Sequence, residues 1–135
     1  MTSYRWELFR YTLQLKEPLR MLGQVLNERG GLILRFSEIY RRSSPVDIFG
    51  EGEITPLPGL HLESLSQAES QIREYLSANL KPTPHSETLF PSVRFGLDMA
   101  LRTLVQSQQE ALGRNYLSVE NGNFIKQIPV NGLTS

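Results

Sequence analysis

Glu51 and Glu53 are the residues whose type and spacing most directly suggest chemistry, because two acidic side chains alternate along a stretch that reads as a strand. Residues two apart in a strand point to the same face of a sheet. Paired carboxylates there can hold a divalent cation or act as acid and base. More often such a pair is solvated or salt-bridged, and Arg10 and Arg35 are available as partners on the sheet. We therefore interpret the two glutamates as solvated or salt-bridged and assign no metal site.

The other candidate groups stand alone. The sequence has no cysteine and two histidines, which excludes thiolate sites and a histidine-rich metal site. His61 lies at the start of a predicted helix, where an exposed capping-region residue is as good an interpretation as a functional one, and His85 lies in a predicted surface loop. The lysines Lys16, Lys81 and Lys126 are isolated, and no nucleophile elbow or phosphate-binding glycine loop is present. We therefore assign no catalytic residue.

Length and charge narrow the class of protein. A chain of 135 residues is the size of one domain. Fourteen basic residues balance fourteen acidic ones, which argues against nucleic acid or a membrane surface as a general partner. The N-terminal residues lack the apolar stretch of a signal peptide, and no apolar run reaches the length of a membrane span. We expect a cytoplasmic protein.

The first half of the chain predicts a small antiparallel meander. Residues 4–15 alternate between apolar and polar side chains, with a change of phase near Phe9 that suggests a bulge. Pro18 should end this strand, and Gly30 with Gly31 should provide a bend that needs positive φ or close packing. The expected strands are 4–15, 32–36 with a candidate start at 24–26, and 48–54, and the expected loops are 19–23 and 37–47.

The second half changes to a helical period. Apolar residues recur at steps of three and four from Leu62 to Leu80 and again after Ser92, which we place as the N-cap of the second helix. Gly113 is expected just past the end of that helix, and residues 124–133 are expected to form one more strand. Strands followed by helices indicate an α+β fold, here a three-stranded antiparallel sheet followed by a helical pair.

The segment 52–60, GEITPLPGL, is the unusual feature of the chain. It begins like a strand and then places two prolines and a glycine within four residues. Proline fixes φ, so such a turn is stiff and loses little entropy when it becomes ordered. It is either a plain connection between a strand and a helix or a preformed wall of an apolar binding site.

Several stretches, in order and over nearly the whole chain, match one family. They are YRW at 4–6, RGGL at 29–32, GEITPLPGLHLESLSQA at 52–68, PSVRFGLDMAL at 91–101 and PVNGL at 129–133. The block at 52–68 is similar to G-E-I-x-P-L-P-G-[FL]-S-x-E-[ST]-x-x-x-A, and with PSVRFG it resembles the N-terminal capping domain of the o-succinylbenzoate synthases, in the enolase superfamily. His61 departs from that pattern, which has serine there, so the first helix should lose its usual N-cap side chain.

The resemblance implies that residues 1–122 are a capping domain and that 123–135 begin a (β/α) barrel otherwise absent from the sequence. In that superfamily the barrel carries a lysine of a K-x-K motif and three acidic ligands for Mg²⁺. The implied reaction is the dehydration of 2-succinyl-6-hydroxy-2,4-cyclohexadiene-1-carboxylate to o-succinylbenzoate, in menaquinone or phylloquinone biosynthesis. Those groups would lie outside this chain, so we expect the chain alone to bind no Mg²⁺ and to be inactive.

The resemblance also places two capping-domain loops over the mouth of the barrel, where they exclude water and shape the pocket. Arg20 is the charged candidate to meet a substrate carboxylate, and a surface arginine is an equal alternative. A small-molecule substrate would bind only with the barrel present. The residues that the resemblance assigns to substrate contact are Leu19, Arg20, Met21, Pro56, Leu57, Pro58, Gly59 and Leu60.

Two alternatives remain open. Another reaction of the superfamily, N-acylamino-acid racemisation or dipeptide epimerisation, would use the same fold. A free-standing interaction domain that kept the fold and lost the enzyme would show polar replacements on its barrel-facing surface. That surface stays apolar at 56–58, 124–125 and 128–130, so we expect the isolated chain to self-associate through it.

Overall fold

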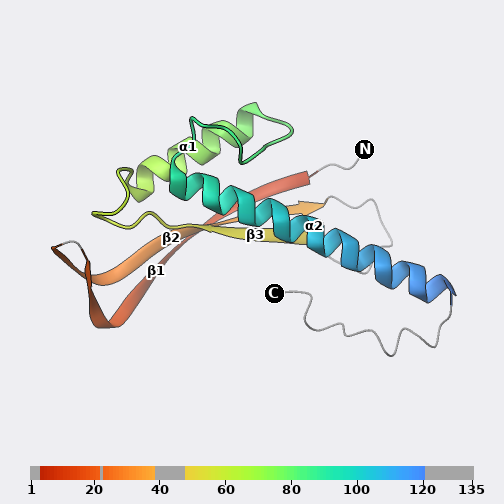
Figure 1. Cartoon of the computed structure of the whole chain (residues 1–135), viewed down its shortest axis with the longest axis horizontal. Coiled ribbons are helices and arrows are strands. Elements are labelled where there is room, and N and C mark those ends of the chain that lie inside the picture. Colours follow the sequence, from red (N-terminus) through yellow and green to blue (C-terminus); the bar gives the residue numbers. More distant parts are fainter. Residues whose placement is uncertain (1–3, 22, 39–47, 121–135) are drawn as a thin grey trace.

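The computed structural model describes residues 4–21, 23–38 and 48–120. The strands form one antiparallel sheet, ordered as in the sequence, and both helices lie on the same face of it (Figure 1). The predicted α+β fold is confirmed, and in the described part of the chain neither helix is long and apolar enough to cross a membrane. The elements are β1 (Tyr4–Met21), β2 (Gln24–Glu38), β3 (Phe49–Ile54), α1 (Leu65–Ala78) and α2 (Pro91–Glu120).

The pairing of β1 with β2 is more regular than the sequence predicts. It runs from Tyr4 to Gln14 without a shift, so the bulge expected near Phe9 is wrong. Phe9 changes the phase of the apolar pattern because its ring lies on the outer face of the sheet. Phe9 is 42% exposed, and the guanidinium of Arg35 lies 5.2 Å from the centre of its ring.

Pro18 lies within β1, so the prediction that it ends this strand is wrong. The register shifts between Gln14 and Leu19. Residues at such a shift are not paired with the neighbouring strand, so proline, which lacks an N–H, is tolerated there. Pairing with β2 then resumes and continues through Met21. The loop predicted for 19–23 is therefore wrong, because most of these residues belong to the paired end of a long hairpin.

Helix α1 starts later than predicted and carries its own cap. Ser64 is the N-cap and forms a capping box with Gln67: its Oγ accepts from the Gln67 N–H at 3.1 Å, and Gln67 Oε1 accepts from the Ser64 N–H at 2.8 Å. The expectation that His61 costs the helix its N-cap is wrong. Leu62 and Leu80, expected on the buried face, lie outside the helix and are exposed.

Helix α2 differs from the prediction at both ends. It starts at Pro91, which suits the first helical position because the N–H missing there has no partner within the helix. Ser92 is therefore its second residue and not its N-cap. Gly113 lies inside the helix, which continues beyond it. The strand predicted at 124–133 and the barrel start expected from residue 123 lie outside the described residues.

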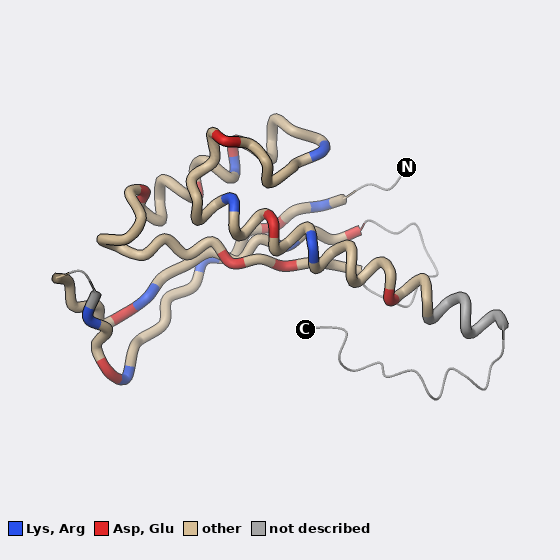
Figure 2. The backbone as a smooth tube through the Cα atoms, viewed as in Figure 1, with Lys and Arg blue, Asp and Glu red and all other residues tan. Residues whose placement is uncertain are grey.

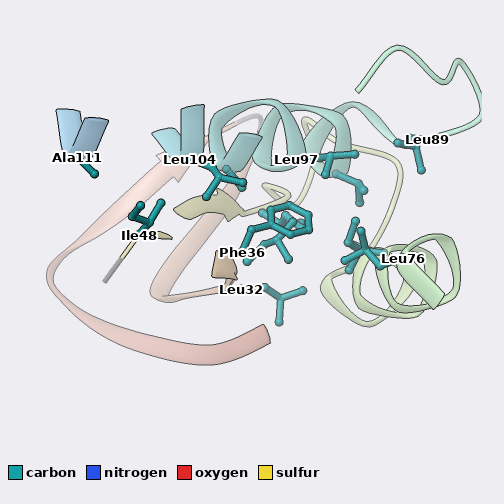
Figure 3. Packing of buried hydrophobic residues seen from close by; sticks show 14 residues of the cluster. Leu32, Phe36, Ile48, Leu76, Leu89, Leu97, Leu104 and Ala111 are labelled. Atoms are coloured by element: carbon teal, nitrogen blue, oxygen red, sulfur yellow. The ribbon is translucent and has the colours of Figure 1, made fainter. Parts of the chain in front are cut away.

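A cluster of buried apolar residues fills the space between the sheet and the helices (Figure 3). Burying one large aliphatic side chain contributes about 1.5–3 kcal/mol, so this cluster is the main favourable term in folding. Trp6 packs against its edge from β1. The members are Leu32, Leu34 and Phe36 of β2, Ile54 of β3, Ala68, Ile72 and Leu76 of α1, Val93, Leu97, Ala100, Leu104 and Ala111 of α2, and Ile48 and Leu89.

The backbones of β3 and α2 approach each other so closely that no side chain fits between them at three positions. A Cβ at Gly50 would meet the backbone of Ala100 and Leu104, and a Cβ at Gly52 would collide with the carbonyl oxygen of Gly96. A Cβ at Gly96 would in turn meet the backbone of β3. Backbone atoms cannot turn aside as a flexible side chain can. Glycine at these positions therefore sets the distance between the sheet and the helix.

We predict that Gly52→Ala destabilises the fold by about 1–3 kcal/mol, the usual cost of overpacking, because the new methyl group must displace α2. Gly113→Ala is the matched control. Its Cβ meets nothing within 4 Å, and alanine should favour the helix by up to about 1 kcal/mol. Urea unfolding followed by circular dichroism measures both changes. A Gly52→Ala chain as stable as the native one would contradict the contact between β3 and α2.

Candidate functional site

The stiff segment rich in proline forms a turn closed by its own backbone. The Leu60 N–H donates to the Leu57 carbonyl at 3.0 Å, and φ of Gly59 is +87°. Proline at the second position and a positive-φ glycine at the third are the pattern of a type II turn. Pro56 is buried and Leu57 half-buried, whereas Pro58, Gly59 and Leu60 are exposed. The turn thus presents an apolar surface in one fixed backbone conformation.

The imidazole of His61 completes this turn. The Leu57 N–H donates to His61 Nδ1 at 2.9 Å, and the His61 N–H donates to the Leu57 carbonyl at 2.9 Å. His61 is half-buried, so its interpretation as an exposed capping-region residue is wrong. The chain's other histidine, His85, lies exposed in a loop, as predicted.

Tyr11 fastens the start of the turn to β1. Its hydroxyl donates to Glu53 and lies 3.3 Å from Thr55 Oγ1. Its ring covers Gly31 on the neighbouring strand, where a side chain would collide with it. Close packing, and not a positive φ, therefore explains why glycine stands at this position. Burial, followed by the hydrogen bond to Glu53, raises the pKa of Tyr11 above its usual value. The hydroxyl therefore stays protonated and remains a donor at neutral pH.

Glu63 joins the segment after the turn to the start of α2. It is only 6% exposed, and its carboxylate accepts from Ser92 Oγ at 2.5 Å and from the Ser92 N–H at 3.3 Å. A negative charge is stabilised there because the first N–H groups of a helix lack partners within the helix. Burial acts to raise the pKa of Glu63. Hydrogen bonds from Ser92 and the backbone oppose this effect, and the pKa lies below its usual value.

The residues predicted in the first closing loop lie at the end of the β1–β2 hairpin. Leu19 and Arg20 are exposed, and Met21 belongs to the last pair of the ladder. The partner of Leu19 is Leu26, about 20 Å along β2 from the point where β3 ends. The structure therefore gathers the predicted site residues into two groups, the hairpin end and the turn. Both groups lie toward the same end of the molecule (Figure 1).

Glu51 does not form a carboxylate pair with Glu53. Its Oε2 lies 2.5 Å from Arg35 Nη2. The same guanidinium lies over two aromatic rings, 5.2 Å from the centre of Phe9 and 5.0 Å from that of Phe49. The predicted ion pair with Arg35 is confirmed, and it sits on the face of the sheet opposite the helices.

Glu53 is bound by the hydroxyl of Tyr11, and Arg10, its other predicted partner, pairs with Glu69 at 3.2 Å. Basic and acidic residues are interspersed along strands and helices alike (Figure 2). Over the residues that the structure describes, no group of three or more histidine, aspartate and glutamate side chains is placed to hold a metal ion.

Sequence reasoning missed the residues that hold the turn in place. Tyr11 reads as an ordinary strand residue, and its hydrogen-bond partner Glu53 lies 42 positions ahead. Glu63 and Ser92 are 29 positions apart. A signal did exist for this pair, because each of the two residues stands inside one of the blocks on which the family resemblance rests.

We predict that Glu63→Gln lowers the free energy of unfolding by about 1–3 kcal/mol at pH 7, because it removes a buried charge-assisted hydrogen bond. The pKa of Glu63 is lower in the folded chain than its usual value of 4.5, so the unfolded chain binds more protons below that pH. The stabilisation is complete at neutral pH and is lost as the pH falls through the folded pKa.

Urea unfolding of the native and variant chains from pH 7 to pH 3 tests this prediction. The difference in stability between them should shrink on the acid side. Glu74→Gln, at an exposed position of α1, is the matched control and should change little. A native-to-variant difference that stays constant with pH would contradict the assigned charge state of Glu63.

The sequence matches the family described as MenC, N-terminal domain, over residues 3–104. It is 37% identical over 116 residues to an o-succinylbenzoate synthase of Pectobacterium atrosepticum, covering 86% of this chain and 34% of that protein. It is 34% identical over 130 residues to one of Haemophilus influenzae, covering 92% of this chain and 34% of that protein. The chain thus spans about a third of the length of these curated relatives.

Solved structures show the same fold. A crystal structure of o-succinylbenzoate synthase from Thermosynechococcus elongatus, with magnesium in its active site, matches with a TM-score of 0.55 at 27% identity, over 73% of this chain and 29% of that one. A mandelate racemase/muconate lactonizing protein from Herpetosiphon aurantiacus matches with a TM-score of 0.63 at 17% identity, over 78% of this chain and 31% of that one, which shows likeness in fold alone. The resemblance found in the sequence is confirmed, and this chain belongs to the MenC N-terminal domain family.

Proposed function

We propose that this chain supplies the capping domain of an o-succinylbenzoate synthase. That enzyme would dehydrate 2-succinyl-6-hydroxy-2,4-cyclohexadiene-1-carboxylate to o-succinylbenzoate, in menaquinone or phylloquinone biosynthesis. The observation that supports this most is the turn from Pro56 to Leu60, which is apolar, closed by its own hydrogen bonds and fixed in one conformation. A surface of this kind is suited to closing over a bound substrate.

Preorganisation suits such a turn to this role. A closing element that is already ordered loses little conformational entropy when it meets its partner, so more of the contact energy remains for binding. An apolar closing element also excludes water and strengthens the electrostatic interactions beneath it. Leu19 at the hairpin end is 38% exposed and Leu60 in the turn is 56% exposed, as expected of surfaces that a barrel and its substrate would cover.

In this proposal the chemistry belongs to the barrel and closure belongs to this chain. Mg²⁺ held by acidic residues of the barrel would stabilise the enediolate that forms when a proton is removed. The part of this chain that the structure describes offers no set of ligands for that ion. Its own contribution would be to cover the barrel mouth with the turn and to present Arg20 from the hairpin end.

A domain exchange tests the proposal. Residues 3–104 of this chain would replace the matching residues of the Pectobacterium atrosepticum enzyme. We expect the chimera to dehydrate the substrate and to remain dispersed in solution. We expect the chain alone to be inactive and to self-associate in light scattering, because Leu13, Leu19, Val25 and Leu60 are exposed.

Two controls make the exchange decisive. The barrel without any capping domain gives the background rate, and circular dichroism with a magnesium titration shows whether the chimera is folded and loaded. A folded chimera that binds Mg²⁺ and has no activity above that background would contradict the proposed function. Turnover of the substrate by the isolated chain would contradict the assignment of the chemistry to the barrel.

We predict that Arg20→Ala in the active chimera raises KM roughly 10-fold or more, since a hydrogen bond to a charged group contributes about 1.5–3 kcal/mol. The substrate carries two carboxylates, and Arg20 is exposed at the hairpin end. Lys16→Ala removes another exposed cation from the same strand and is the matched control. Equal, small effects of both substitutions on steady-state kinetics would make Arg20 an ordinary surface residue.

A further inference from the structure

The Leu57 N–H needs a hydrogen-bond acceptor from outside the turn that Leu57 begins. Leu57 stands between Pro56 and Pro58, so its N–H is the one backbone donor among these three residues. In a type II turn the first residue contributes its carbonyl, which accepts from the fourth residue, while its own N–H is left without a partner inside the turn. An N–H that is removed from water and left unpaired opposes the conformation that buries it.

His61 supplies the missing acceptor and forms a reciprocal pair with the same residue. Its Nδ1 accepts from the Leu57 N–H at 2.9 Å, and its own N–H donates to the Leu57 carbonyl at 2.9 Å. Both backbone groups of Leu57 are therefore bound to His61. The carbonyl also accepts from the Leu60 N–H at 3.0 Å. Moving Leu57 would break three hydrogen bonds at once.

The reciprocal pair requires one particular form of the imidazole. Nδ1 accepts only when it carries no proton, so the ring must be neutral with its hydrogen on Nε2. Asparagine at this position can place its Oδ1 where Nδ1 stands, whereas alanine has no acceptor. These two residues therefore separate the acceptor from the bulk of the ring.

We propose that His61 is a positioning residue that holds the backbone of Leu57 and thereby fixes where Leu57, Pro58 and Leu60 present their side chains. The hydrogen-bonded geometry stands on this chain alone. Its consequence for substrate binding rests on the proposed function of the turn as a closing element.

The first experiment is NMR on the full chain labelled with ¹⁵N, at pH 8. We expect His61 to show an unprotonated, hydrogen-bonded Nδ1 and a proton on Nε2, and we expect the Leu57 amide to be protected from exchange. In His61→Ala the Leu57 amide should exchange roughly tenfold faster, and in His61→Asn protection should be largely restored. His85→Ala, at the exposed histidine, is the matched control and should leave the Leu57 amide unchanged.

An Nδ1 proton on native His61, or equal Leu57 exchange in the native and His61→Ala chains, would overturn the proposal. If His61→Ala does not fold, the ¹⁵N shifts of the native imidazole and the exchange rate of the Leu57 amide in His61→Asn still test the proposal.

The consequence for substrate binding is read in the chimera with the Pectobacterium barrel. There His61→Ala should raise KM several-fold and lower kcat by a smaller factor. His61→Asn should restore most of the native KM. If the unsubstituted chimera is inactive, the proposed function fails, while the NMR result on the chain still stands for or against His61. If the chimera is active and His61→Ala leaves KM unchanged, the role of His61 in presenting the turn to substrate is overturned.

Discussion

The close contact between the backbones of β3 and α2 is the constraint on which the rest of the structure depends. Gly50 and Gly52 leave α2 free to approach the strand, and Gly96 leaves the strand free to approach the helix. A methyl group at any of these positions would separate the two layers, and the core residues between them could not follow without opening voids. The contact therefore fixes the start of α2 relative to the end of β3, where the apolar turn leaves the sheet.

The same contact joins the two separate blocks of sequence on which the family resemblance rests. Gly52 and Glu63 belong to the first block, and Ser92 and Gly96 belong to the second. Gly52 lies against Gly96 before the turn, and Glu63 binds Ser92 after it. The turn is thus held on both sides by the first two turns of one helix. Its position is set by contacts between residues distant in sequence, and its internal shape is set by local residues.

This division decides what could be predicted from the sequence. Periodicity predicted the strands and the helical pair, and the prolines and glycine predicted a stiff turn. These are local signals, which can be read from neighbouring residues. The loop at 19–23 was wrong because Pro18 falls at a register shift, which a rule for regular strands does not anticipate. The prediction that Gly113 follows the end of the second helix was wrong, because a glycine inside a helix looks the same in sequence as one beyond its end. The roles of Tyr11 and Glu63 depend on partners 42 and 29 positions away.

The charged and polar groups around the turn make hydrogen bonds that hold it in place. Tyr11 is bound to Glu53, Glu63 to Ser92, and the acceptor nitrogen of His61 to Leu57. Each of these hydrogen bonds orients its group and favours one protonation state of it. The exposed part of the turn is left to apolar side chains. Under the proposed function this is an efficient division, because an apolar cover lowers the dielectric around a charged reaction centre without competing for its protons.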